Sequence, residues 1–95
     1  MAYIANSTFD DCENLVEIDL PDTVNYIGSF AFYYCKSLEK LVLPESIREI
    51  EDAAFVGCLS LKELRFKGKT IDEVYHMRKY PWGIRDESII KCEGE

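Results

Sequence analysis

The sequence lacks several features typical of membrane proteins, secreted proteins and common classes of enzyme. No run of residues approaches the roughly 20 apolar positions that a helix needs to cross a bilayer. The start of the chain carries no basic segment followed by an apolar run, so no signal peptide is predicted. Phosphate-loop, dinucleotide-binding and H-E-x-x-H motifs are also missing. We therefore expect a cytoplasmic protein, free in the host cytosol or assembled into a particle there.

Residues suited to metal binding or nucleophilic catalysis are few and poorly grouped. His76 is the single histidine, and the 4 cysteines form no C-x-x-C pair. A nucleophilic pairing of His76 with Cys92 would need an orienting acid as well, and nothing in the spacing favours it. Neighbouring carboxylates such as Asp10 and Asp11 fall in predicted turns, where solvation accounts for them. We expect no catalytic residue, no metal site and no cofactor.

Positive charge is also scarce, and the deficit is local. The 95 residues carry a formal net charge of −7. Residues 1–66 hold 12 acidic and 5 basic side chains, whereas residues 67–95 hold 6 of each. An acidic surface repels nucleic-acid phosphates and anionic lipid, so neither a nucleic acid nor a membrane is the expected partner. Two interpretations of the excess stay open: it keeps a small domain soluble, or it attracts a basic protein surface.

What the sequence does contain is an internal repeat of 23 residues. Residues of the same kind recur at this spacing from residue 4 to residue 66. The aligned sets are Ile4, Ile27 and Ile50; Phe9, Phe32 and Phe55; Cys12, Cys35 and Cys58; Leu15, Leu38 and Leu61; and Ile18, Leu41 and Leu64. A period of roughly 20–50 residues predicts a stacked repeat fold. Because one copy cannot bury its own apolar face, we expect three copies to stack, with ladders of like residues in the core.

Each copy is predicted to hold a short strand and a short helical turn. Leu41 and Leu43 alternate with Val42, which predicts a strand whose leucines face the core while Val42 faces outward. Pro44 ends that strand because it cannot donate to the ladder. Residues 29–35 are expected to form one or two turns of helix. The aligned cysteines are expected to form a row of small, buried, reduced thiols, not disulfides.

The repeat ends after Phe66, and residues 71–95 are predicted to form a C-terminal cap. Thr70 and Glu73 match a capping box at the start of a helix of about eight residues. A short strand near residues 88–92 is expected to pair with the sheet edge. The final repeat is expected to be covered by Val74, Trp82, Ile84 and Ile90. The predicted fold class is an α/β solenoid of short parallel strands and short helical turns with a helix–turn–strand cap. It forms a single domain of residues 1–95, with repeats at 4–26, 27–49 and 50–70.

The repeat resembles the BspA-like branch of leucine-rich repeat proteins. Its copies IANSTFDDCENLVEIDLP, IGSFAFYYCKSLEKLVLP and IEDAAFVGCLSLKELRF follow the pattern I-x-x-x-A-F-x-x-C-x-x-L-x-x-[IL]-x-[IL]-P. Thr8 replaces the small residue in the first copy, and Lys67 replaces the proline in the third. The resemblance covers residues 4–70 and implies a curved solenoid used for binding, without a catalytic residue. The ending PWGI followed by SII resembles the caps of repeat proteins encoded by phages and prophages.

Two surfaces are candidates for partner binding. Outward strand positions form two rows on the expected concave sheet face, which are Glu17, Lys40 and Glu63, and Asp19, Val42 and Arg65. Two interpretations stay open: the rows only pair charges between strands, or they form a binding face of mixed charge. Aromatic residues exceed what the core needs, and these are Tyr26, Phe30, Tyr33, Tyr34 and Tyr80. Tyr33 and Tyr34 stand where the third copy has Val56 and Gly57, so the repeat does not require them, and tyrosine is enriched in binding interfaces.

The sequence favours a non-enzymatic protein-binding module encoded by a phage or a bacterium. The first copy lacks a cap, so its apolar flank is expected to be covered by a second copy, another protein or further repeats. Oligomerisation is therefore expected. Two alternatives stay open: a phage inhibitor of a host defence protein that acts through its acidic surface, and a terminal module of a phage tail fibre or bacterial surface protein.

Overall fold

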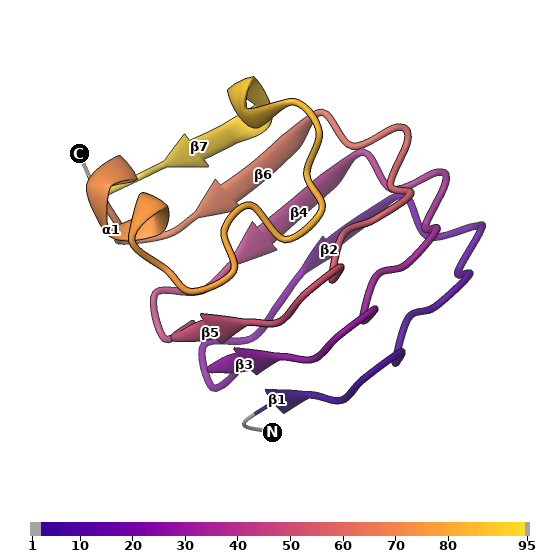
Figure 1. Ribbon diagram of the computed structural model, residues 1–95, viewed down its shortest axis with the longest axis horizontal. Helices are drawn as coiled ribbons and strands as arrows, with labels where there is room; N and C mark the ends of the chain where they lie inside the picture. The colour runs from indigo at the N-terminus through magenta and orange to yellow at the C-terminus, as the bar shows by residue number, and fades with distance from the viewer. Residues whose placement is uncertain (1–2, 95) are drawn as a thin grey trace.

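The computed structural model describes residues 3–94 and is a solenoid of about four turns, built from parallel strands (Figure 1). We call residues 4–26 coil 1, residues 27–49 coil 2 and residues 50–70 coil 3. One sheet has the order β1-β3-β5, with bounds Tyr3–Ile4, Tyr26–Ile27 and Glu49–Ile50. The other has the order β2-β4-β6-β7, with bounds Glu17–Asp19, Lys40–Leu43, Glu63–Phe66 and Ile90–Cys92. The predicted solenoid of stacked coils with short parallel strands is confirmed.

The strand pairing has the register that the repeat predicts. Glu17 lies opposite Lys40, which lies opposite Glu63, and all three strands run parallel. The shorter sheet has the same spacing, with Ile27 paired to the isoleucine of the coils on both sides. Equivalent residues of successive coils are therefore direct neighbours in space.

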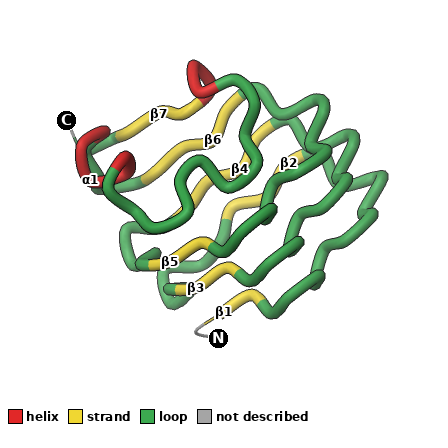
Figure 2. The backbone as a smooth tube through the Cα atoms, in the orientation of Figure 1, coloured by secondary structure: helices red, strands yellow, loops and turns green. Residues whose placement is uncertain are grey.

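The segment predicted to be helical, residues 29–35, forms a series of turns instead (Figure 2). Phe30 and Tyr34 have φ values of 58° and 54°, a left-handed conformation that interrupts a right-handed helix. The backbone N–H of Tyr33 donates to the carbonyl of Phe30 in its own coil, whereas the N–H groups of Phe32 and Tyr34 donate to carbonyls of coil 3. Because alternate N–H groups bond to the next coil, the hydrogen-bond pattern of an α-helix cannot form.

The same turn recurs in each coil at the predicted spacing. Ser7 and Asp11 in coil 1, and Ala53 and Gly57 in coil 3, also have positive φ values. We call the segments 7–12, 30–35 and 53–58 the corners of the coils. They lie on the right-hand side of Figure 1, stacked on one another.

An aromatic ladder runs through the core. The ring centroids of Phe9 and Phe32 are 5.1 Å apart with nearly parallel planes, and those of Phe32 and Phe55 are 5.7 Å apart. Trp82 of the cap continues the ladder edge-on, 6.2 Å from Phe55. The backbone N–H of Phe55 donates to the Trp82 carbonyl at 3.1 Å. This carbonyl therefore acts as the acceptor that Ala54 of the next coil provides for Phe32.

The cap begins with α1, which spans Ile71–Tyr75. The predicted capping box between Thr70 and Glu73 is present. The helix has 5 residues, fewer than the pattern predicts, because the chain turns after His76 and Lys79 adopts a left-handed φ of 65°. A short 3₁₀ helix, η1 at Glu87–Ile89, leads into β7, which pairs in parallel with β6. The four residues predicted to cover coil 3 are buried, and they are Val74, Trp82, Ile84 and Ile90.

The first coil is less well covered than the second. Four of its ladder residues are only partly buried, and they are Phe9, Cys12, Leu15 and Ile18. Their equivalents in coil 2 are 0% exposed, and they are Phe32, Cys35, Leu38 and Leu41. β1 and β2 each lie at the edge of their sheet. The structure therefore leaves one end of the apolar stack open.

Candidate functional site

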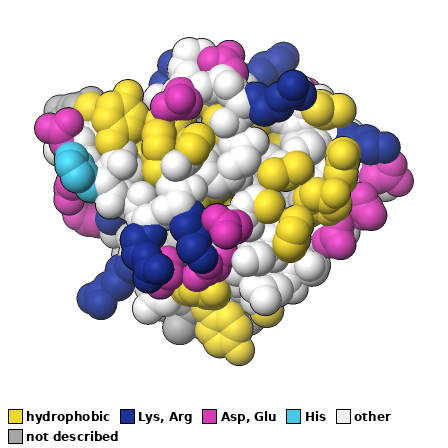
Figure 3. Space-filling model, in the orientation of Figure 1, with side chains coloured by type: hydrophobic (Ala, Val, Ile, Leu, Met, Phe, Trp, Pro, Cys, Tyr) yellow, Lys and Arg dark blue, Asp and Glu magenta, His cyan; other side chains and the backbone are white. Residues whose placement is uncertain are grey.

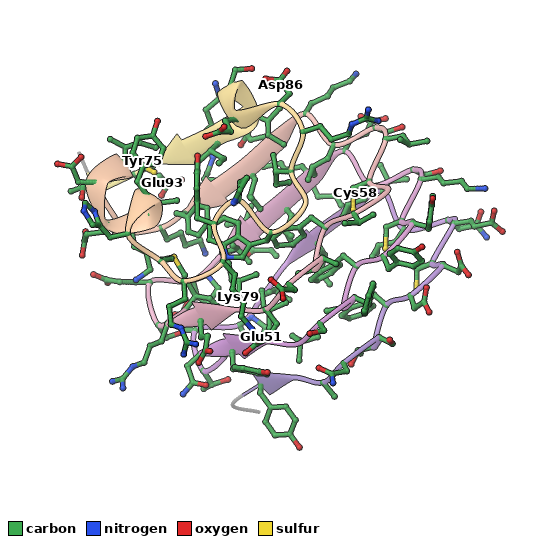
Figure 4. The ribbon with its side chains drawn as sticks, viewed as in Figure 1. Glu51, Cys58, Tyr75, Lys79, Asp86 and Glu93 are labelled. Carbon is green, nitrogen blue, oxygen red and sulfur yellow. The ribbon has the colours of Figure 1, made fainter. Side chains whose placement is uncertain are left out.

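The cysteine ladder is part of the framework. The Cys35 thiol donates to the Phe9 carbonyl at 3.1 Å, and the Cys58 thiol donates to the Phe32 carbonyl at the same distance. Burial raises the pKa of Cys35 to about 11 and the pKa of Cys58 to about 12. Both thiols are therefore protonated at neutral pH and are weak nucleophiles. Cys58, on the corner of coil 3, is labelled in Figure 4.

The histidine contributes to the end of α1. Nδ1 of His76 lies 2.7 Å from the Asp72 carbonyl, one turn earlier in the chain. No group of three or more His, Cys, Asp or Glu side chains is placed to hold a metal ion among residues 3–94. In this same range, no helix is both long and apolar enough to cross a membrane.

The charged residues on the outer face of the β2-β4-β6-β7 sheet are largely paired with one another. We call Glu17, Asp19, Lys40, Val42, Glu63 and Arg65 the sheet face. Oε2 of Glu63 lies 3.9 Å from Nζ of Lys40 and 2.6 Å from Nε of Arg65. The hydrogen bond from Arg65 holds the pKa of Glu63 below its usual value. Arg65 also reaches Glu93 of the cap, with 3.1 Å between Nη1 and Oε2.

Beside the second row of the sheet face, an ion pair joins coil 3 directly to coil 1. Nζ of Lys67 in coil 3 lies 3.4 Å from Oδ1 of Asp19 in coil 1. This pair extends over the middle coil, and Val42 between the two is only 6% exposed although it is not part of the core cluster. At 6% exposure, the expected outward valine offers little apolar surface to a partner. Glu17 at the sheet edge stays exposed.

A second surface lies on the corner of coil 2, and we call Phe30, Tyr33 and Tyr34 the aromatic corner. Phe30 and Tyr34 are 44% and 37% exposed, and Tyr33 is half-buried. The rings pack edge to face, with centroids 5.2 Å apart for Phe30 and Tyr33 and 4.4 Å apart for Tyr33 and Tyr34. The Tyr34 ring rests on Gly57 of coil 3, where an added Cβ would lie 2.6 Å from its Cδ1. The three rings are thus held by one another and by the next coil.

The backbone of the aromatic corner is unusual for such large side chains. Phe30 and Tyr34 both adopt left-handed φ values. A bulky residue in this region costs on the order of 1–3 kcal/mol relative to glycine. The equivalent positions in coil 3 hold Ala53 and Gly57, which fit the same turn with smaller side chains. The fold therefore tolerates the aromatic residues but does not need them.

Carboxylates flank the aromatic corner on the coil 1 side. The backbone N–H of Asp11 donates to the Tyr33 carbonyl at 2.8 Å, which places the two corners in direct contact. Burial, the hydroxyl of Tyr34 and the charges of Asp10 and Asp11 together raise the pKa of Tyr33. Within residues 3–94, neither aspartate takes part in an ion pair. On the face shown in Figure 3, hydrophobic side chains gather toward the corners and acidic side chains lie at the rim.

The sequence pattern locates part of the second surface. Tyr33 and Tyr34 lie together, as the comparison between copies predicts. The sequence places Phe30 among the surplus aromatic residues but does not assign it to the site. The same comparison contained the signal, since the equivalents of Phe30 are Ser7 and Ala53. The three aromatic rings lie together because the segment forms a turn, and the helix expected from the sequence does not predict this grouping.

A shallow hollow of about 270 Å³ lies where coil 3 meets the cap. Its lining includes Cys58, Leu59, Ile84 and Asp86. Leu59 is 67% exposed, the largest exposed fraction among the large hydrophobic side chains that the structure describes. The protonated Cys58 thiol already donates to a backbone carbonyl there, so the hollow holds no activated nucleophile.

Comparison with known proteins identifies the repeat. A family model described as "BspA type Leucine rich repeat region (6 copies)" matches residues 1–77. No curated protein and no solved structure matches the chain. The matched region contains the three coils and α1, and the rest of the cap, with Trp82 and β7, follows it.

Proposed function

Since the chain belongs to the BspA-type leucine-rich repeat family, we propose that it is a protein-binding module without catalytic activity. Stacked repeats present a fixed, extended surface, and a partner that binds such a surface causes little change in the backbone. The use of Cys35 and Cys58 as hydrogen-bond donors between coils supports a framework role for the thiols.

The observation that carries this proposal is the aromatic corner. It exposes Phe30 and Tyr34 on backbone that favours small residues, at positions where the other coils have small or polar side chains. Natural sequences keep such local strain mainly where it serves a function. Aromatic side chains that are rigid and partly exposed are also common sources of binding energy. We therefore assign the main contact surface to the aromatic corner.

The sheet face is a second candidate surface in the same proposal. Within residues 3–94, Glu17 is its exposed member without an ion pair, whereas Asp19, Lys40, Glu63 and Arg65 already form ion pairs. A partner here would have to replace those pairs with others of equal quality. The sheet face therefore supports steering and orientation of a partner more than binding energy.

The proposal is tested by affinity capture with two variants of the whole chain. The corner variant, Phe30→Ala with Tyr33→Val and Tyr34→Gly, carries the residues that coil 3 has at the same positions. The face variant carries Glu17→Gln, Lys40→Gln and Glu63→Gln. We expect a partner protein that is retained by the natural chain and the face variant and lost from the corner variant. Loss from the face variant alone would move the site to the sheet, and retention by all three chains would contradict both surfaces.

We also propose that the open end of coil 1 is covered by a second copy of the chain. The support is the partial exposure of its ladder residues and of Val16, which is 49% exposed beside β2. Sedimentation velocity over a range of concentrations should show a dimer, and Val16→Lys should shift the equilibrium to monomer. A monomer at every concentration would contradict self-association.

A more specific role as an inhibitor of a host defence protein is supported by charge alone. The acidic excess lies in residues 1–66, and its carboxylates could compete with nucleic acid for a basic channel. Capture of a nucleic-acid-binding defence protein would favour this role. The alternative of a terminal module on a tail fibre or surface protein is favoured if longer relatives carry more coils before the same cap. Both alternatives propose that the chain is encoded by a phage or a bacterium.

A further inference from the structure

We propose that the aromatic corner and the neighbouring Asp10 and Asp11 form a site for an arginine- or lysine-bearing segment of the partner protein. This inference rests on the proposed function, because it names the chemistry that the same surface recognises. It extends the site from coil 2 onto coil 1 and gives a binding role to two carboxylates that the sequence pattern explains by solvation in a turn.

The rings of the aromatic corner form a row with exposed ends. Phe30, Tyr33 and Tyr34 pack edge to face in a row, so each ring meets its neighbour without covering it completely. Phe30 and Tyr34, at the two ends of the row, keep more than a third of their surface exposed. A cationic group that lies over an aromatic face is attracted by the ring quadrupole, and an arginine guanidinium can also stack on it.

Negative charge lies beside the rings. Some carboxylates of the coils have basic neighbours, as Glu13 has Lys36 at 3.7 Å and Glu49 has Arg78 at 3.8 Å, whereas others, such as Glu17, form no ion pair within residues 3–94. Asp10 and Asp11 have no such neighbour within residues 3–94. A basic side chain that crosses the aromatic corner would reach these carboxylates and form a charge-assisted hydrogen bond.

The combination of rings and carboxylates disfavours other classes of ligand. The two aspartates repel phosphate groups, so the backbone of a nucleic acid does not suit the site. A purely apolar segment would desolvate the carboxylates without pairing them, which is unfavourable. A basic segment satisfies the rings and the carboxylates together. The net charge of −7 also speeds its approach at low salt.

The test selects peptides from a random display library against the folded natural chain. We expect enriched sequences to share an arginine or lysine at a fixed position. A synthetic peptide of the enriched sequence is then titrated against each chain by fluorescence polarisation. Replacing its basic residue with uncharged citrulline, for arginine, or norleucine, for lysine, should weaken binding on the order of tenfold.

Three variants separate the contributions. The corner variant should lose binding by tenfold or more, on the order expected for interface aromatics. Asp10→Asn with Asp11→Asn should weaken binding about threefold to tenfold and remove most of its salt dependence. Asn also tolerates the left-handed backbone at Asp11, which has a φ of 58°. Asp22→Asn with Glu45→Gln makes the same charge change outside the corners and should leave affinity within about twofold.

The outcomes distinguish this inference from the proposed function. Enriched peptides without a basic residue that still need the aromatic corner would overturn the inference and keep the proposed function. If the chain instead binds a glycan on an array, and this binding needs the aromatic corner, the inference is overturned as well. If no peptide or glycan depends on the corner, both fail. Should the corner variant unfold, the aspartate variant still decides, since unchanged affinity there contradicts the inference.

Discussion

The two ends of the solenoid differ in how the stack is closed. At the C-terminal end, Trp82 completes the aromatic ladder and β7 completes the larger sheet. At the N-terminal end, and among the residues that the structure describes, Phe9 has a ring partner on one side only, and β1 and β2 are edge strands. The same type of residue is therefore fully buried in coil 2 and half-buried in coil 1. Burial in this fold depends on the neighbouring coil more than on the residue.

The comparison also shows that the stack has a hydrogen-bond polarity. The corner N–H groups of coil 1 donate to the carbonyls of Ser29, Ala31 and Tyr33 in coil 2. The equivalent carbonyls of coil 1 belong to Asn6, Thr8 and Asp10, and they accept no hydrogen bond within residues 3–94. The open corner thus presents acceptors. If two copies met through their first coils, these two sets of backbone carbonyls would not bond to each other, because acceptors do not pair with acceptors.

The largest expected loss of stability comes from removing the Trp82 ring, which closes the C-terminal end of the stack. Trp82 is 1% exposed and contacts the rings of Phe55, Phe66 and Tyr80. Trp82→Ala should lower the free energy of unfolding by about 3–5 kcal/mol, because it leaves a cavity between coil 3 and the cap. The measurement is urea denaturation followed by circular dichroism. Tyr75→Ala, at a cap residue that is 51% exposed, is the control and should cost less than about 1 kcal/mol.

The next largest loss of stability is expected in the aromatic ladder, where two positions can be compared. Phe32→Ala should cost about 3–5 kcal/mol, because the ring is 0% exposed and stacked on both sides. Phe9→Ala should cost roughly half as much, because its ring has one neighbour and is partly exposed. Denaturation at two protein concentrations sharpens the test. Equal costs, with the Phe9 value rising with concentration, would mean that a second copy covers coil 1 in solution.

A smaller effect is expected at the start of α1. The side chain of Thr70 accepts a hydrogen bond from the backbone N–H of Glu73, and the carboxylate of Glu73 accepts one from the backbone N–H of Thr70. Thr70→Ala removes the first bond and should cost about 1 kcal/mol. Thermal unfolding of this variant is compared with Thr23→Ala, which alters an exposed turn residue. A Thr70→Ala variant as stable as the control would show that the cap is held by its apolar contacts alone.

The smallest expected effect is a loss of folding stability at low pH. The carboxylates with lowered pKa values are in coil 3 and the cap, and they are Glu51, Glu63, Glu73 and Asp86 (Figure 4 labels two of them). Their causes are hydrogen bonds from Lys79, Arg65, the Thr70 backbone and Ser88. A lowered pKa in the folded state stabilises the fold above the unfolded value, which is 4.5 for glutamate, and this contribution is lost as the pH falls through the folded value.

Urea denaturation at pH 6 and pH 3 measures this effect. The natural chain should be less stable at pH 3, and Glu63→Gln should show a weaker pH dependence because its side chain no longer titrates. The effect is small because these ion pairs are near the surface, where solvent screens them. Stability that rises as the pH falls would contradict the assignment of these hydrogen bonds.

The sequence alone determined the period of 23 residues, the ladders of like residues, the parallel register and the cap over coil 3. These features follow from spacing, because equivalent residues become neighbours as soon as the copies stack. The capping box was equally readable, since it depends on residues three apart. The candidate site was only partly readable: the excess of Tyr33 and Tyr34 was visible, but their grouping with Phe30 and Asp10 was not.

Tertiary structure decided the rest. The corners form turns and not helices, since alternate N–H groups find partners in the next coil, and no local pattern records that competition. Val42 lies between Asp19 and Arg65 in the sheet register and is 6% exposed, and an ion pair joins Lys67 to Asp19, which are 48 residues apart in the chain. The spacing places such residues on stacked coils, but the three-dimensional geometry decides which of their atoms form hydrogen bonds or ion pairs across the coils.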